Sequence, residues 1–591
     1  MASTREGTLT GAQIAILNHR IEGINKKMAN TIMRTGRSGV LNRARDFSVC
    51  VLTGDCRLLS SAEALPIHTL CGPDMMAQSM LEFHPNLRRG DAYIHNSPYH
   101  GNSHAADQGI IVPVLDDQGR HRFSVVVKAH QADIGNSIPT TLHAVARDVY
   151  EEGALIFPCV KIQQDYRDID DVIRMCLMRI RVPEQWYGDL LATIGAARIG
   201  ERELMALAAE VGWDTLDEFA ASWFDYSERR MVEAIRAIKS GTATTYSVHD
   251  SFPGTPPEGI RITATVTVDT EEALIDVDYR KCPDCMPCGL NLTESTSRTA
   301  AMVGVFNSIS PDVPKNAGSF RRIRIHLRAN AIVGIPPHPV SCSVATTNIA
   351  DHATNCVQMA IAEIAEGAGM AEVGYAFTPT TGTISGVDPR NGKRYVNMVF
   401  FGHTGGAASG RNDRWLTLLH VGNGGLCNID GAELSELYHP VVIRERRLVQ
   451  DTEGAGRFTG APSIRVEYGP IGGPLDLVFA SDGTDHPPQG IRGGLAGGRA
   501  AQQVRRRNGY VEDLDKVTQI VLDEGETTIG VACGGGGYGD PRRRDPEKVA
   551  HDVAESWISV IRAREVYGVA INADGSVDHA TTNTLRAMAA E

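Results

Sequence analysis

The sequence predicts an α+β protein of several domains, with mixed and antiparallel sheets and with helices at its N-terminal and C-terminal ends. Apolar residues recur at three- and four-residue steps over residues 17–32, as they do on one face of a helix. Short apolar runs alternate with loops rich in Gly, Asn and Pro over residues 46–135, which indicates strands. Since 591 residues exceed what one hydrophobic core usually organises, we expect about two to four domains.

The first 135 residues predict one helix followed by strands. Thr10 and Gln13 have the spacing of a capping box, which places the start of the helix just before its apolar stripe. The strands that follow are expected in five short segments: 47–52, 57–61, 91–96, 109–115 and 122–129.

The rest of the chain divides into a helical stretch, a sheet and a closing helix. Helices are predicted over about 165–240, 295–310 and 350–366, and the period-two alternation after Gly241 predicts an antiparallel sheet. Residues 395–480 are rich in Gly and short strands. A last helix is expected to start with Asp545 as N-cap and to run through Ile561. We place boundaries near 240 and 450, giving an N-terminal metal-binding catalytic region (1–240), a central α+β region (241–450) and a C-terminal β-rich region (451–591).

Composition and charge exclude several classes of function. The formal net charge of −13 argues against a nucleic-acid surface, and 42% hydrophobic residues are ordinary for a globular protein. The N-terminal residues lack the apolar core of a signal peptide, and no apolar run approaches the length of a membrane span. Twelve cysteines in so long a chain fit reduced thiols, so we expect a cytoplasmic protein.

Residues 91–136 contain side chains that are typical metal ligands. His104 and Asp107 form an H-x-x-D pair in a loop rich in Gly, Ser and Asn, and His130 ends the apolar run 123–129. Imidazole and carboxylate groups at loops and strand ends are what a catalytic divalent metal needs. Because an H-x-x-D pair is common, a structural role remains the alternative for each histidine taken alone.

A C-x-x-C-x-x-C run formed by Cys282, Cys285 and Cys288 also has metal-binding spacing. A structural zinc site needs four ligands, and no matching pair of cysteines or histidines follows. We therefore favour three reduced thiols in a Pro-containing loop, and a second metal or a redox-sensitive patch stays open.

Several segments together match one family. They are R-D-F-S (45–48), G-D (90–91), N-S-P-Y (96–99), S-H-A-A-D (103–107), H-Q-A-D-I-G (130–135) and residues 312–323, 534–549 and 563–569. With these segments the chain resembles the hydantoinase B family, the B-type subunits of ATP-dependent hydantoinases, 5-oxoprolinases and lactamases. That family is related to the large subunits of acetone and acetophenone carboxylases. The resemblance runs from near residue 14 to residue 588.

The resemblance implies a site for one divalent metal, zinc or manganese, held by Asp46, His104, Asp107 and His130. For Asp46, only the match to the family's R-D-F-S carboxylate argues for ligation. His68 matches a P-x-H segment of the family and is predicted to face the cavity as a catalytic residue. Asp133 is predicted to orient a ligand imidazole or to act as a general base, and a cap of the turn after it is the alternative.

The resemblance further implies that the chain is one part of an ATP-dependent hydrolase of cyclic amides. Its substrate would be hydantoin, N-methylhydantoin, 5-oxoproline or another lactam. ATP with magnesium would bind to a separate A-type subunit of actin-like fold, in heterotetramers or larger assemblies, and a need for bicarbonate stays open. The glycines at 534–537 are not followed by the Gly-Lys-Ser/Thr of a phosphate loop, and we expect them to allow tight turns.

Two other functions stay open from the sequence. The first is the large subunit of an acetone- or acetophenone-type ATP-dependent carboxylase. The second is a non-enzymatic scaffold, which is disfavoured because metal-ligand residue types in loops have no purpose there.

Overall fold

The computed structural model describes residues 9–62, 65–375, 377–413, 416–417 and 427–588. Its first element is helix α1 (Gly11–Thr35), and the Thr10 hydroxyl accepts a hydrogen bond from the backbone of Gln13, as the capping box predicts. The buried side chains of α1 include those of the apolar stripe at 17–32. Two short helices follow within the first 70 residues, α2 (Gly39–Asn42) and α3 (Pro66–Thr69).

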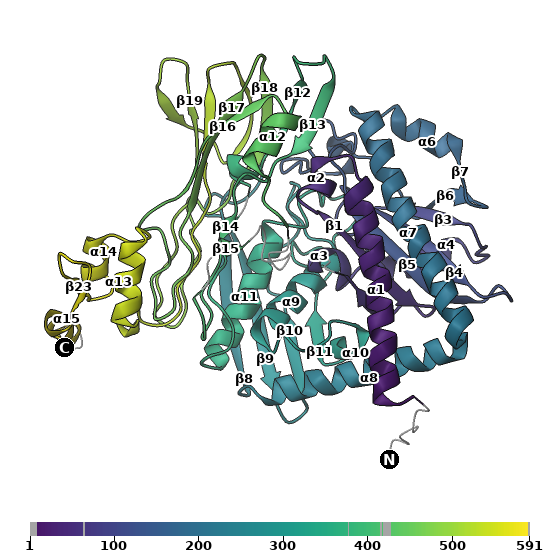
Figure 1. Ribbon diagram of the computed structural model, residues 1–591, viewed down its shortest axis with the longest axis horizontal. Coiled ribbons are helices and arrows are strands. Elements are labelled where there is room, and N and C mark those ends of the chain that lie inside the picture. Colours follow the sequence, from purple (N-terminus) through teal and green to yellow (C-terminus); the bar gives the residue numbers. More distant parts are fainter. Residues whose placement is uncertain (1–8, 63–64, 376, 414–415, 418–426, 589–591) are drawn as a thin grey trace.

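A seven-stranded antiparallel sheet forms most of the N-terminal part, in the order β2-β1-β5-β4-β3-β6-β7. Helices α1 and α7 (Pro183–Val211) pack side by side on one face of this sheet, and α4 (Pro73–Phe83) packs on the other (Figure 1). Five strands lie where the sequence predicts them: β1 (Phe47–Thr53), β2 (Leu58–Ser61), β3 (Ala92–His95), β4 (Asp107–Leu115) and β5 (His121–His130). The sequence analysis did not predict the last two, β6 (Val160–Gln164) and β7 (Arg167–Asp168).

The helical stretch predicted over 165–240 begins later than expected, because β6 and β7 occupy the chain up to Asp168. After α5 (Val149–Glu152), the helices are α6 (Asp170–Leu177), α7 and α8 (Trp213–Arg236). The antiparallel sheet expected after Gly241 is present as β8 (Gly241–His249), β9 (Ile260–Asp269) and β10 (Leu274–Asp278). A fourth strand, β11 (Ile323–His326), pairs in parallel with β10.

Two predicted helices lie against this central sheet. They are α9 (Glu294–Ser308) and α11 (Ile349–Ile364), within a few residues of the expected bounds, and α10 (Ala317–Phe320) lies between them in the chain. Their apolar residues form the largest hydrophobic cluster together with the inner face of β8–β10.

The second half contains two further sheets, ordered β13-β12-β18-β21 and β16-β17-β22-β19-β20. The predicted boundary near 450 falls inside them, because β12 pairs with β18 and β16 pairs with β17 across it. The elements are β12 (Thr383–Val387), β13 (Arg394–Met398), β14 (Thr404–Gly405), β15 (Leu416–Thr417), α12 (Ala432–Tyr438), β16 (Val441–Leu448), β17 (Ile464–Pro470), β18 (Leu475–Ala480), β19 (Ala501–Arg505), β20 (Val511–Asp513), β21 (Val517–Leu522) and β22 (Thr527–Val531), with 3-10 turns η1 (Pro379–Thr381) and η2 (Pro541–Arg543).

The single closing helix predicted from Asp545 through Ile561 is wrong. Asp545 does cap α13 (Pro546–Ala554), but Ser556 adopts a positive φ of 61°, which ends the helix, and α14 (Val560–Glu565) starts anew with Ser559 as its cap. With β23 (Ala570–Ile571), β24 (Val577–Asp578) and α15 (His579–Ala587), these helices form a small lobe at the edge of the molecule (Figure 1).

The glycines at 534–537 do not make the tight turns that we expected. Their backbone runs between other glycine-rich loops and is hydrogen-bonded to them, for example from the Gly535 N–H to the carbonyl of Ala461. A Cβ built on Gly535 would lie 2.1 Å from the carbonyl oxygen of Gly406. Glycine is therefore required by the close approach of backbones.

No helix among the described residues is long and apolar enough to cross a membrane.

Candidate metal centre

Three neighbouring strands place three predicted ligands in one row. Asp107, the first residue of β4, is the register partner of His130, the last residue of β5. Asp46 directly precedes β1, where Phe47 pairs with Ala129, and its carbonyl accepts a hydrogen bond from the backbone N–H of His130. Sequence positions 46, 107 and 130 therefore meet at one edge of the seven-stranded sheet.

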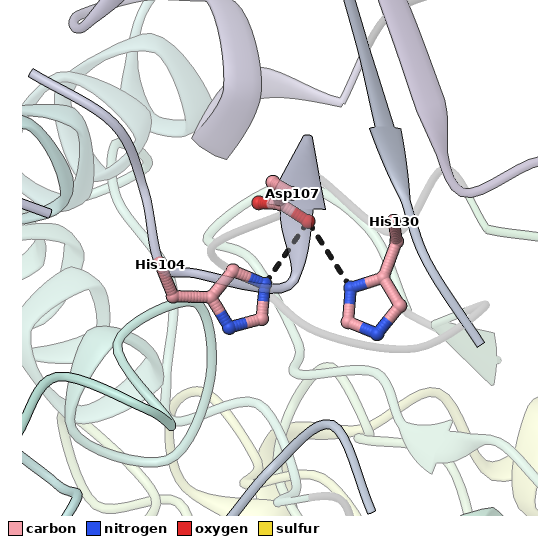
Figure 2. A group of neighbouring side chains, drawn as sticks. All are labelled: His104, Asp107 and His130. Atoms are coloured by element: carbon pink, nitrogen blue, oxygen red, sulfur yellow. Dashed lines mark hydrogen bonds and ion pairs between the residues drawn. The ribbon is translucent and has the colours of Figure 1, made fainter. Parts of the chain in front are cut away.

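His104 reaches this row from the loop before β4. Asn102 folds that loop back, because its side-chain amide donates to the carbonyl oxygens of His104 and Asp107 at 2.6 and 2.8 Å. Figure 2 shows both imidazoles pointing at the Asp107 carboxylate: His104 Nε2 and His130 Nδ1 lie 3.0 and 3.1 Å from the same oxygen, Oδ1. All three side chains are buried, and their ligand atoms lie within 4.8 Å of one another.

The hydrogen bonds behind His104 determine which ring nitrogen carries the proton. His104 Nδ1 lies 2.8 Å from the carbonyl oxygen of Ser343, which only accepts, so Nδ1 is the donor. In the neutral ring the Nε2 lone pair then faces an Asp107 oxygen, and Nε2 has no hydrogen-bond partner among the described residues. Two acceptors at this distance repel each other unless a proton or a metal ion lies between them. These residues therefore fit a metal ion, with Ser343 fixing the ligand ring from behind.

His130 is also held through the ring nitrogen that faces away from Asp107. Its Nε2 lies 3.0 Å from Thr141 Oγ1, and its Nδ1 faces Asp107. Each imidazole therefore presents one nitrogen to the shared carboxylate oxygen and has its other nitrogen fixed by a neighbour, as metal-ligating histidines usually have.

Asp46 and His68 lie beside this group of three. Asp46 Oδ2 is 3.9 Å from His130 Nδ1, and Asp46 Oδ1 is 3.7 Å from His68 Nε2. His68 Nε2 also lies 3.0 Å from the second Asp107 oxygen, while Ser48 Oγ is 3.1 Å from His68 Nδ1. With the Ser48 hydroxyl donating to Nδ1, His68 donates from Nε2 and links the two carboxylates.

Most of the chain matches one family of enzymes. A family model described as hydantoinase B/oxoprolinase matches residues 11–541. The chain belongs to the hydantoinase B/oxoprolinase family. This confirms the resemblance seen in the sequence segments.

Relatives of this family member include enzyme subunits of similar length. The beta subunit of the caprolactamase of Pseudomonas jessenii is 28% identical over 98% of this chain and 99% of its own length. A 5-oxoprolinase of Dictyostelium discoideum is 22% identical over 89% of this chain, which corresponds to 40% of that larger protein. A crystal structure of the ATP-dependent caprolactamase from Pseudomonas jessenii superposes with a TM-score of 0.87 at 26% identity, covering 98% of this chain and all of that chain.

The fold is shared with a carboxylase as well. A nucleotide-free structure of acetone carboxylase superposes with a TM-score of 0.86 at 16% identity, over 98% of this chain and 82% of that chain. The multidomain α+β architecture is therefore common to lactam-opening and carboxylating enzymes, and the fold alone does not separate the two reactions.

The site of this hydantoinase B family member has an excess of negative charge. Burial raises the pKa of Asp107, but His104 and His68 outweigh burial and hold that pKa well below its usual value. Burial lowers the pKa of His130, whereas Asp46 and Asp107 raise it by more, so that the net shift is upward. Two carboxylates that attract protons onto neighbouring imidazoles would attract a divalent cation in the same way.

Asp133, predicted to be catalytic, has hydrogen-bond partners outside the group of candidate metal ligands. Its carboxylate accepts hydrogen bonds from the backbone and the guanidinium of Arg181 and from the backbone N–H of Gly135. These contacts match the alternative of a cap for the turn after His130. Its catalytic role stays a prediction.

The sequence analysis missed several residues around the site. Thr141, Ser343 and Ser103 each contact a predicted ligand, the last by a short hydrogen bond from its hydroxyl to Asp107. Cys427 is fully buried nearby, where burial, Asp46 and Asp107 raise the pKa of its thiol. Only Ser103 had a signal in the sequence, since it directly precedes the H-x-x-D pair.

Lys128 was also missed, although it lies on β5 two residues before His130. Its side chain is 1% exposed, and Nζ has no hydrogen-bond partner among the described residues. Burial lowers the pKa of this ammonium to about 8. Alternation along a strand places it on the same face of the sheet as His130.

The thiols of the cysteine run at 282–288 do not belong to the group of candidate metal ligands among the described residues. Cys282 and Cys288 are buried, Cys285 is partly exposed, and all three are free thiols. Among the described residues, only His104, Asp107 and His130 form a group with the geometry of a metal site.

Proposed function

We propose that this chain is the metal-holding subunit of an enzyme that opens a cyclic amide ring in an ATP-dependent reaction. The observation that carries the proposal is the buried group of His104, Asp107 and His130, in a chain that matches the beta subunit of the caprolactamase over nearly its full length. Hydantoin, N-methylhydantoin, 5-oxoproline and larger lactams are the substrate classes that the family suggests. We also propose a cytoplasmic location.

We propose that His104, Asp107 and His130 hold one zinc or manganese ion and that Asp46 completes the set. Two imidazoles and two carboxylates suit either metal. Bound there, the ion would supply a Lewis acid for the amide carbonyl and would lower the pKa of a bound water towards neutrality.

The residues of the chain itself would then orient the ligands and move protons. Ser343 and Thr141 fix the two imidazole rings, and Ser103 and His68 occupy the second oxygen of Asp107. Of the two residues predicted to be catalytic, we assign acid–base chemistry to His68, which contacts both carboxylates. Asp133 would act at a distance, by holding the turn after His130 through Arg181.

The energy for ring opening would come from a partner. Hydrolysis of an unstrained cyclic amide is close to thermoneutral, so coupling to ATP drives it. The related caprolactamase and hydantoinase chains are named as the beta and B subunits of their enzymes, which implies partner subunits in those enzymes. We propose an A-type partner of actin-like fold that binds ATP and magnesium, in a heterotetramer or larger assembly.

The runner-up is an acetone- or acetophenone-type carboxylase, which the structural match to acetone carboxylase keeps open. In that reaction the same residues would hold a metal beside a ketone that becomes an enolate. Bicarbonate would supply the new carboxylate, whereas in an amidase it would serve only to activate the amide. A bicarbonate requirement alone does not separate the two reactions.

The deciding experiment follows a label. The chain, reconstituted with its A-type partner, metal and Mg-ATP, is given cyclic amides or ketones together with ¹³C-bicarbonate. We expect ring-opened product without ¹³C, and a rate that rises over about pH 6–8, the range in which a bound ion would lower the pKa of water. Label retained in a new carbon–carbon bond of a ketone product would replace the amidase by the carboxylase.

A further inference from the structure

A small cavity is lined by residues of the sheet β13-β12-β18-β21 and by residues next in the chain to those that hold the ligand imidazoles. About 10 Å³ of it is open to the centre of a water molecule, which is room for roughly one water. Its walls come from segments that are far apart in the sequence. The apolar part of the lining is Leu142, Val344, Phe377, Met398, Val478, Phe479 and Ala480.

Two lining residues directly follow residues that fix the ligand imidazoles. Leu142 follows Thr141, whose hydroxyl contacts His130 Nε2 at 3.0 Å. Val344 follows Ser343, whose carbonyl accepts the proton of His104 Nδ1. The cavity is thus one residue along the chain from the contact that fixes each ligand imidazole.

The lining suits a hydrocarbon group. None of the described side chains that line the cavity is charged. Of the lining threonines, Thr140 is within hydrogen-bond distance of Thr383, at 3.4 Å between the hydroxyl oxygens. Thr381 lies at the same distance from the hydroxyl of Thr380. These hydroxyls lie near other threonine hydroxyls, and the lining offers a ligand no charged group among the described side chains.

The backbone at Phe377 is strained. Phe377 has a φ of 66°, in the left-handed region that an aromatic side chain rarely adopts, and its side chain is buried. Strain of this kind persists only where the surroundings enforce it, and it is concentrated at ligand sites. Here it sets the position of an aromatic wall of the cavity.

We propose that this cavity is a specificity pocket, which receives the substituent on the ring carbon next to the carbonyl that is attacked. This inference rests on the proposed function, because it needs a carbonyl at the metal centre. The proposal places that substituent against Leu142 and Val344, each of which directly follows a residue that fixes a ligand imidazole. The cavity selects substrates that carry hydrogen or a methyl group there, and it rejects branched alkyl groups.

The test enlarges and fills the cavity in turn. Met398→Ala removes most of a buried side chain from the lining, and Ala480→Val adds two carbons to it. Cyclic amides with hydrogen, methyl or isopropyl on that carbon are compared by kcat/KM in the complex with the partner. We expect the wild type to discriminate against isopropyl by tenfold or more, the range of one methylene in an apolar pocket.

The two variants should shift this ranking in opposite directions. Met398→Ala should raise kcat/KM for the isopropyl substrate about tenfold relative to kcat/KM for the unsubstituted one. The gain should come mainly through a lower KM, because the substitution relieves a clash in ground-state binding. Ala480→Val should lower kcat/KM for the methyl substrate about tenfold relative to kcat/KM for the unsubstituted one. Metal content, measured in parallel, should equal that of the wild type.

Met28→Ala is the matched control, because Met28 is fully buried in α1, in the core on the α1/α7 face of the seven-stranded sheet. It should leave the ranking unchanged. Calorimetric binding of the same compounds without ATP gives the ranking independently of ring opening. Binding ranked by substituent size without any turnover would overturn the amidase and keep the pocket. Turnover with the same ranking in wild type, Met398→Ala and Ala480→Val would overturn the pocket.

Discussion

Removal of one imidazole should empty the metal site. His104→Ala and His130→Ala each delete a ligand atom that lies within 3.1 Å of Asp107 Oδ1. The remaining carboxylates keep their negative charge but lose a fixed partner. We expect the wild type to hold about one divalent ion per chain and both variants to hold none. A metal site with only a few ligands loses most of its affinity when one of those ligands is removed.

The size of the effect on stability follows from mass action. Metal at a hundredfold excess over its Kd stabilises the folded state by about 2.7 kcal/mol. An unfolding entropy of about 2.1 cal/mol/K per residue converts this into a rise in Tm of about 2 °C if all 591 residues unfold together. The rise would be about 5 °C if the predicted region 1–240 unfolds as a separate unit.

Elemental analysis after gel filtration gives the metal content, and calorimetric scans with and without added metal give the shift in Tm. His121→Ala is the control, because His121 starts the same strand and its ring lies 2.9 Å from the hydroxyl of Ser124, away from the candidate ligands. It should keep both the ion and the shift. Stoichiometric metal in His104→Ala and His130→Ala would refute the assignment of the site.

Three further outcomes are expected. Thr141→Val removes the hydroxyl behind His130 and should weaken metal affinity about 10–100-fold in a chelator competition, and unchanged affinity would contradict the role of Thr141. In the metal-free protein the raised pKa of His130 adds stability that is fully present below pH 6.5 and is lost as pH rises through the folded pKa. Denaturant titrations should therefore show that the wild type's excess in free energy of unfolding over His130→Asn shrinks above pH 6.5. An excess that grows with pH would contradict a raised pKa of His130. The isolated chain should give no heat with Mg-ATP in calorimetry, and micromolar binding would argue against a separate nucleotide-binding partner.

Much of the metal centre was encoded locally in the sequence. Asp107 and His130 begin and end the two apolar runs of one hairpin, whose turn is at Asp117–Gln118 and whose register shifts by one residue between Val114 and Leu115. In an antiparallel pair, residues at equal distances from the turn face each other, so counting from the turn places Asp107 within one residue of His130 and predicts that the two lie close together. The sequence analysis named both residues but did not use this register.

What the sequence could not give depends on contacts between distant segments. Ser343 lies more than 200 positions from His104, yet it fixes the proton of that ring. Asp133 was expected near His130, but Arg181 binds it, since a buried carboxylate next to a guanidinium is satisfied there. The prediction of one continuous helix after Asp545 was wrong for a local reason. The apolar spacing continues past Ser556, and the positive φ of Ser556 cannot be read from periodicity.

The glycine-packed loops around residues 534–537 have a consequence for reading sequences of this family. Any side chain on Gly535 or Gly537 would collide with a neighbouring carbonyl at 2.1 or 2.2 Å. Natural selection would therefore preserve these positions as strictly as a catalytic residue, although they do no chemistry. A search for the active centre that ranks positions by invariance alone would therefore select these glycines. They lie far along the chain from the imidazoles and carboxylates of the first sheet.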